Sequence, residues 1–218
     1  IDACLVGSEM CIRDRIQRAA KMLSDAKFPV ILSGAGVVIG DAINECKALA
    51  EKLDAPVCNG YQHNDSFPGS HPLAVGPLGY NGSKAAMQLI SKADVVLALG
   101  TRLNPFSTLP GYGIDYWPKN ANIIQVDMNP DRIGLTKKVT VGIAGDAKQV
   151  AKQIFDKLSS NAGDSGREDR KNLIHQTKSA WLQTLTSLDH EDDDPGTVWN
   201  KEARERDKDR MSPRQAWR

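Results

Sequence analysis

A glycine pair and a threonine–arginine pair have residue types and positions that suit the binding of a phosphate group. Gly34 and Gly36 follow an apolar run and precede a helical pattern, where glycine lets a phosphate approach the backbone amides closely. The third glycine of a dinucleotide fingerprint would fall at Ile39, so a tight turn for helix–strand packing is an equally good interpretation. Thr101 and Arg102 follow another apolar run, and the arginine could bind a phosphate or form a salt bridge with a neighbouring loop.

Asp127 closes a third apolar run and has the chemistry to accept hydrogen bonds from ribose hydroxyl groups. Its alternative role is to cap a helix that begins near Pro130. His63 lies in a polar loop and is more simply a hydrogen-bonded loop residue than a catalyst, and the cysteines and histidines do not cluster as in a zinc site. We therefore predict no catalytic or metal-binding residue, and one set of candidate cofactor-binding residues: Gly34, Gly36, Thr101, Arg102 and Asp127.

Segment 104–118 is long, aromatic and rich in turn-forming residues. A loop of this kind after a central strand often carries function, and its tyrosines and tryptophan could line a ligand or an interface. Packing over the sheet edge or on a neighbouring domain is the alternative that we favour.

Short apolar runs predict the strands that position these loops. The runs lie at 30–34, 55–57, 95–100, 123–127 and 139–143. Because helical patterns separate them, they predict a parallel sheet covered on both faces, a doubly wound α/β domain over residues 16–160. Ligands bind beyond the carboxyl ends of such strands, where the candidate residues lie.

The helical patterns include one apolar stripe from Ile39 to Leu53 and a helix that Ser83 could cap. Segment 159–166 predicts a flexible linker, and residues 161–218 predict a helical or extended linker that leads into a further domain. Residues 1–15 have the character of a non-native segment, and we exclude them from the fold prediction. A net charge of +1 over 218 residues gives no reason to expect nucleic acid or a membrane as partner.

The order of several motifs resembles the central domain of thiamine-diphosphate-dependent enzymes, a Rossmann-like domain in a group that includes acetolactate synthase, oxalyl-CoA decarboxylase and pyruvate oxidase. The motifs are Gly60, His71-Pro72, Gly76, Gly79, Gly82, the run VVLALG with Thr101-Arg102, the run IIQVD with Asn129-Pro130, and Gly145-Asp146. In such relatives the central domain binds FAD, ADP or nothing, and the candidate residues occupy the matching positions. They could therefore also be a vestigial nucleotide cleft, or serve domain packing and oligomer contacts.

Segments 60–87 and 100–119 are more specifically similar to the sulfoacetaldehyde acetyltransferase branch of that family. The resemblance implies that a complete enzyme uses thiamine diphosphate and Mg²⁺ to convert sulfoacetaldehyde and phosphate into acetyl phosphate and sulfite. It implies a homodimer or homotetramer whose partner is a small-molecule substrate, and the few, unclustered cysteines indicate a reduced, cytoplasmic protein. The cofactor-binding motifs lie in other domains, so this chain is expected to be inactive alone.

Two alternatives remain open: a fragment of an acetolactate synthase-like enzyme, and a stand-alone FAD- or ADP-binding module. One further motif is misleading. Gly145-Asp146-Ala147 with Asn172 superficially matches the family's magnesium motif, but a long helix and a linker separate the two parts. We therefore assign no metal site to them.

Overall fold

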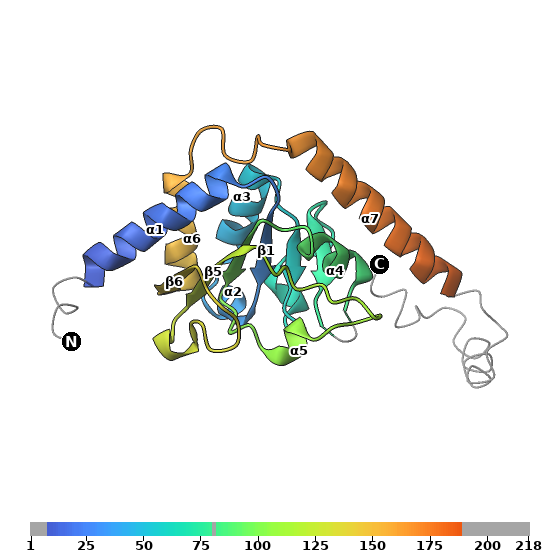
Figure 1. Ribbon diagram of the computed structural model, residues 1–218, viewed down its shortest axis with the longest axis horizontal. Coiled ribbons are helices and arrows are strands. Elements are labelled where there is room, and N and C mark those ends of the chain that lie inside the picture. Colours follow the sequence, from blue (N-terminus) through green and yellow to red (C-terminus); the bar gives the residue numbers. More distant parts are fainter. Residues whose placement is uncertain (1–7, 80–81, 189–218) are drawn as a thin grey trace.

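The computed structural model describes residues 8–79 and 82–188, which form a six-stranded sheet surrounded by helices (Figure 1). The strand order is β3-β2-β1-β4-β5-β6, and every neighbouring pair is parallel. The strands are β1 (Pro29–Ser33), β2 (Val57–Asn59), β3 (Ala74–Pro77), β4 (Val95–Leu99), β5 (Asn122–Asp127) and β6 (Val141–Ala144). This topology confirms the predicted doubly wound α/β fold.

The helices cover both faces of the sheet. They are α1 (Ser8–Asp25), α2 (Ala35–Ile39), α3 (Ile43–Leu53), α4 (Lys84–Ile90), α5 (Pro105–Thr108), α6 (Ala147–Lys157) and α7 (Arg167–Leu188), with short 3₁₀ turns η2 (Asn64–Ser66) and η3 (Pro130–Arg132). Both α1 and α3 pack against α6. The chain crosses the sheet in opposite directions from β1 to β2 and from β3 to β4, so right-handed crossovers place α3 and α4 on opposite faces. No described helix is long and apolar enough to cross a membrane.

The two central strands, β1 and β4, form where the apolar runs predicted them, and every residue of both strands is buried. They pair in parallel from Pro29 opposite Val95 to Ser33 opposite Leu99, which brings their carboxyl ends to the same edge. The predicted cap at Ser83 is also confirmed, since its hydroxyl accepts a hydrogen bond from the backbone amide of Ala86. These elements set the positions of the loops at the carboxyl edge.

The cysteines among the residues with described side chains, Cys46 and Cys58, are buried free thiols of the core. Burial raises the pKa of Cys46 to about 12, and it raises the pKa of Cys58 as well. Both thiols therefore stay protonated at neutral pH, as expected of structural cysteines.

Strand β3 was not among the predicted strands. It contains Gly76 and Pro77, residues that normally argue against a central strand. The structure tolerates both because β3 is the edge strand and pairs only with β2. Gly76 has a φ of +92°, and a Cβ there would lie 2.8 Å from the Cβ of Ser83.

The predicted apolar stripe from Ile39 to Leu53 is wrong at its first residue. The chain forms two helices here, because Asp41 takes a left-handed φ of 49° between α2 and α3. The Asp41 carboxylate lies 2.7 Å from the ammonium group of Lys148, which lowers the pKa of the aspartate. Ile39 consequently leaves the core and is 84 % exposed.

Segment 159–166 is packed on the domain, contrary to the predicted flexible linker. Ala162 is fully buried, and the ammonium group of Lys52 donates to the carbonyl of Ser160 at 2.6 Å. Gly163 has a φ of +84°, and a Cβ there would lie 2.8 Å from the Cα of Leu53. A glycine- and serine-rich composition suggests flexibility, but here it permits close backbone contact with α3.

Helix α7 confirms the predicted helical pattern after residue 166, and residues 189–218 lie outside the described part of the chain. Helix α1 passes through the expected boundary after residue 15, and the guanidinium of Arg15 donates to the carbonyl of Gly142 at 2.9 Å. The expected division into residues 1–15, 16–160 and 161–218 remains a prediction.

Candidate functional site

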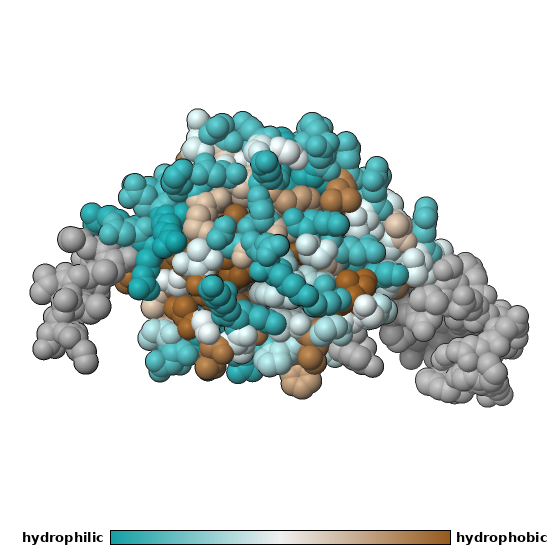
Figure 2. All heavy atoms as spheres, viewed as in Figure 1, coloured by the Kyte–Doolittle hydropathy of each residue, from teal (hydrophilic) through white to brown (hydrophobic). Residues whose placement is uncertain are grey.

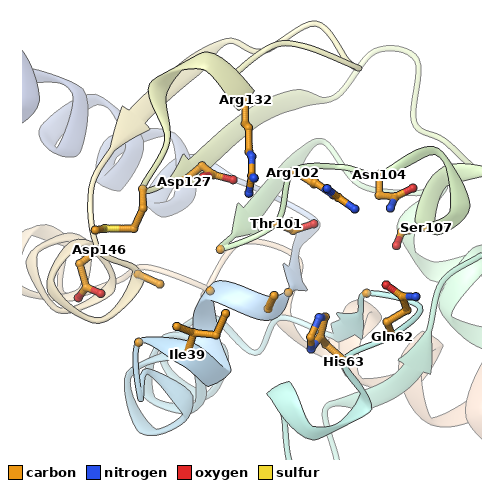
Figure 3. A pocket seen from close by; sticks show the side chains of 18 of the residues that line it. Ile39, Gln62, His63, Thr101, Arg102, Asn104, Ser107, Asp127, Arg132 and Asp146 are labelled. Atoms are coloured by element: carbon orange, nitrogen blue, oxygen red, sulfur yellow. The ribbon is translucent and has the colours of Figure 1, made fainter.

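All five candidate residues line one cleft of about 500 Å³ at the carboxyl edge of the sheet (Figure 3). The loops that follow β1, β2, β4, β5 and β6 contribute its walls. The strand order places the ends of β1 and β4 side by side, so segments more than 60 residues apart in sequence meet here. The cleft residues that the sequence analysis singled out are Gly34, Gly36, Thr101, Arg102 and Asp127.

Gly34 and Gly36 serve close packing between two loops. Their amides already donate within the protein, that of Gly34 to the carbonyl of Leu99 at 3.1 Å and that of Gly36 to the carbonyl of Gly100 at 2.8 Å. A Cβ on Gly34 would lie 2.6 Å from the Cβ of Thr101, and one on Gly36 would lie 2.7 Å from the Cα of Gly100. The packing interpretation therefore accounts for both glycines, and these two amides are not free to bind a phosphate.

Arg102 extends from a loop that several hydrogen bonds hold in place. The buried side chain of Gln125 donates to the carbonyl of Thr101 at 3.2 Å. The next residue, Leu103, is fully buried with a φ of 54°, and its carbonyl accepts from the hydroxyl of Thr136 at 2.9 Å. The Arg102 side chain is exposed and forms no ion pair within residues 8–79 and 82–188, so the alternative of a salt bridge with a neighbouring loop is not found there.

Gln125 also holds the loop that carries a second arginine, Arg132. Its amide nitrogen donates to the carbonyl of Arg132 at 3.3 Å, and its amide oxygen accepts from the backbone of Gly134 at 2.9 Å. Arg132 lines the same cleft as Arg102. One buried amide therefore joins the two arginine-bearing loops.

Asp127 does not cap the 3₁₀ turn η3. That role belongs to Asn129, whose side chain accepts from the backbone amide of Asp131 at 2.9 Å. One carboxylate oxygen of Asp127 accepts a hydrogen bond from the backbone amide of Asn129 at 2.9 Å. Asp127 itself is mostly buried at the cleft wall. Met128, the next residue, is 70 % exposed, and Ile39 on the α2 side of the cleft is also largely exposed.

The aromatic loop 104–118 packs onto the domain, which confirms the favoured alternative. Tyr116 is buried, and its hydroxyl donates to the carbonyl of Ser107 at 3.2 Å. Tyr112 donates to the carbonyl of Gly82 and makes an edge contact with Trp181 of α7. Apolar residues remain exposed at the end of the molecule that carries α5, among them Phe106 and Leu109 (Figure 2).

Three polar cleft residues were not singled out individually, because polar loop residues have no periodic signal. Gln62 and Asn104 lie in the segments 59–66 and 100–105, which follow predicted strands and were expected at the ligand-binding edge, whereas Ser107 lies further along the chain. Position after a predicted strand is the signal that indicates the first two.

The misleading magnesium motif has its two parts at opposite edges of the sheet. Asp146 lines the cleft at the carboxyl edge, where it caps α6 by accepting from the amide of Gln149 at 3.0 Å. Asn172 belongs to α7, which is anchored two residues earlier by Arg170 on the carbonyls of Lys27 and Leu53, before β1 and β2 begin. No group of three His, Cys, Asp or Glu side chains in the described part of the chain could hold a metal ion.

Comparison with known proteins decides the family. The family described as "Thiamine pyrophosphate enzyme, central domain" matches residues 16–154, which include all six strands and the cleft. The chain belongs to this family.

Relatives of this chain include acetyltransferases and an acetolactate synthase subunit. A probable sulfoacetaldehyde acetyltransferase of Rhizobium meliloti (strain 1021) is 79% identical over 93% of this chain, and that of Roseovarius nubinhibens is 71% identical over 94%. A probable acetolactate synthase large subunit of Methanocaldococcus jannaschii is 38% identical over 80%. The chain covers 34% of the length of each acetyltransferase, so this central domain spans about a third of those relatives.

Proposed function

We propose that this chain is the central domain of a sulfoacetaldehyde acetyltransferase, whose complete form converts sulfoacetaldehyde and phosphate into acetyl phosphate and sulfite. The observation that carries this proposal is the gap between 68–79% identity to three acetyltransferases and 38% identity to an acetolactate synthase. The complete enzyme is a cytoplasmic homodimer or homotetramer that acts on a small molecule and binds neither nucleic acid nor membrane.

The central domain supplies structure, and the chemistry belongs to the rest of the enzyme. In the complete enzyme, thiamine diphosphate with Mg²⁺ would supply the carbon–carbon and carbon–sulfur bond chemistry. The described residues of this chain include no metal-binding group, and its carboxyl-edge loops are fixed by internal hydrogen bonds such as those of Gln125. We propose that the 218-residue chain alone is not catalytic, because the family match that it carries is to the central domain.

The test is made on the complete gene and on this chain in parallel. The purified complete protein, given sulfoacetaldehyde, phosphate, thiamine diphosphate and Mg²⁺, is expected to release sulfite and acetyl phosphate in equal amounts. Omission of thiamine diphosphate is the control and should abolish both products, while the 218-residue chain should form neither. Acetolactate formation from pyruvate, without sulfite release, would assign the chain to the acetolactate synthase-like alternative.

A second function concerns the cleft, which we propose binds a nucleotide such as ADP or FAD. Asp127 offers a buried carboxylate, and Arg102 and Arg132 have no ion pair in the described residues. Ile39 and Met128 present exposed apolar surface at the same cleft, which suits a planar base. Gly34, Gly36 and Thr101 take part by bringing the loops after β1 and β4 together.

Isothermal titration of the full chain with ADP and with FAD tests this second function. We expect Asp127→Asn to weaken binding about tenfold or more, because a hydrogen bond to a charged carboxylate contributes about 1.5–3 kcal/mol and each 1.4 kcal/mol is about tenfold in affinity. Asp131→Asn is the matched control, since Asp131 is exposed nearby but does not line the cleft. Absence of binding by the unchanged chain would leave the cleft as a packing feature.

A further inference from the structure

Large apolar side chains gather on one exposed surface at the end of the molecule that carries α5. We refer to this group as the aromatic surface, and its members are Tyr61, Phe106, Leu109 and Tyr112. The backbone amide of Tyr61 donates to the hydroxyl of Ser107 at 3.2 Å, and the hydroxyl of Tyr112 donates to the carbonyl of Gly82 at 3.2 Å. These bonds join the loops that follow β2, β3 and β4.

Close packing around Gly79 makes the aromatic surface continuous. A Cβ on Gly79 would lie 3.2 Å from the ring of Tyr61 and would also meet the carbonyl of Phe106. A Cβ on Gly111 would lie 3.3 Å from the carbonyl of Gly79. The three loops therefore touch through their backbones, while the apolar side chains stay exposed.

The segments that build the aromatic surface contain no charged residue. They are 55–62, 72–83 and 104–114, although 25% of the residues of the whole chain are charged. The cores of protein interfaces are depleted in charge and enriched in aromatic side chains, and exposed apolar patches mark interaction sites. The aromatic surface therefore has the composition of a docking site.

Helix α7 passes beside the aromatic surface as it leaves the domain. It packs on α4, and Trp181 makes an edge contact with Tyr112 at 5.7 Å between the ring centroids. The helix ends about two turns later at Leu188, and the sequence continues to Arg218. Because an extended chain advances about 3.3 Å per residue and a helix about 1.5 Å, a few residues after Leu188 suffice to return alongside Trp181.

One stretch of the sequence after α7 matches the aromatic surface in chemistry. Residues 195–200, with the sequence PGTVWN, carry no charge, whereas 189–194 and 201–210 on either side consist mostly of charged residues. Pro195-Gly196 is a turn signal at which the chain can reverse direction, and Val198 and Trp199 follow it. A tryptophan contributes a large apolar area to a contact. This stretch therefore suits an uncharged aromatic surface better than its charged neighbours do.

We propose that residues 195–200 dock on the aromatic surface, with Val198 and Trp199 packed against Phe106 and Leu109. Docking covers apolar side chains that the described part of the chain leaves exposed at this end. It also fixes the direction in which the chain continues after α7. The inference rests neither on nucleotide binding nor on the acetyltransferase activity.

Site-directed crosslinking in the full 218-residue chain tests the docking. Leu109→Cys and Thr197→Cys are combined in a background with Cys4→Ser and Cys11→Ser, and a short bis-maleimide is added. The buried thiols Cys46 and Cys58 are retained. We expect a crosslink within one chain.

Two substitutions in this background should each remove most of the crosslink, Trp199→Ser on the segment and Phe106→Ser on the aromatic surface. Trp217→Ser is the matched control, because Trp217 lies in the same sequence segment after α7 but outside 195–200. It should leave the yield unchanged. Far-UV circular dichroism of each variant establishes that the fold is retained.

Phe155→Cys with Thr197→Cys is the control for position. Phe155 is 40 % exposed on α6, and Leu109 is 42 % exposed in the aromatic surface, so the two cysteines are equally accessible. This pair should give no crosslink. Equal yields for both pairs, or a yield that Trp199→Ser does not lower, would overturn the proposal. A crosslink that joins two chains would also overturn it and would assign the aromatic surface to a second copy.

Discussion

Replacement of Arg170 by leucine is expected to lower the free energy of unfolding by at least about 5 kcal/mol, because it leaves five backbone carbonyls without this partner and an unsatisfied buried carbonyl costs about 1–3 kcal/mol. Arg170 is 1 % exposed. Its guanidinium donates to five carbonyls at 2.6–3.0 Å, those of Lys27, Leu53, Asp54, Gly163 and Ser165. It therefore ties the start of α7 to the turns before β1 and β2.

Urea unfolding followed by circular dichroism measures this loss, and two variants act as controls. Arg167→Leu removes a partly exposed arginine one turn earlier, which pairs with Asp54 and Asp164, so it should cost less than about 1 kcal/mol. Arg170→Lys keeps the charge, but a lysine has its donors on one nitrogen only. Its loss in free energy of unfolding should therefore lie between the losses of Arg170→Leu and Arg167→Leu. Equal losses for Arg170→Leu and Arg167→Leu would show that the five hydrogen bonds add little.

The sheet was predictable because its strands are set by local composition. Strand β4 is a continuous apolar run, β1 is apolar up to Ser33, and β5 is apolar apart from Gln125 and its two ends, which is close to the pattern that a buried parallel sheet requires. The site followed from a general rule, since residues after neighbouring parallel strands converge at one edge. Arg102 and Asp127 could therefore be placed in one cleft without knowledge of their contacts.

The rest depends on contacts that a local pattern does not contain. Arg170 lies in a charged run and has the appearance of a surface residue, yet its partners lie up to 143 residues away in sequence. Ile39 fits a helical stripe, but the left-handed turn at Asp41 removes it from the core. The donor character of Asn104 arises only once its oxygen is used by the amide of Phe106.

Substitution of Gly36 by alanine should lower the free energy of unfolding by about 2 kcal/mol. Two effects oppose each other, because alanine favours the helix α2 by about 1 kcal/mol whereas overpacking costs about 3 kcal/mol. The new Cβ would lie 2.7 Å from the Cα of Gly100 and 3.1 Å from its carbonyl oxygen. Both are backbone atoms, so no flexible side chain can move aside and the clash should exceed the gain in helix propensity.

Two glycines with open space where a Cβ atom would lie provide the controls for urea unfolding of Gly36→Ala. A Cβ on Gly69 meets no heavy atom within 4 Å, so Gly69→Ala should change stability by less than about 0.5 kcal/mol. Gly113 also has open space but a φ of +71°, so Gly113→Ala isolates the cost of left-handed backbone, about 1–2 kcal/mol. Because Thr101 and Arg102 directly follow Gly100, Gly36→Ala should also weaken any ADP binding in the cleft, whereas Gly69→Ala should not. A Gly36→Ala variant as stable as Gly69→Ala would mean that the loops after β1 and β4 can separate freely, and the cleft would then lack the fixed wall on which the proposed nucleotide binding depends.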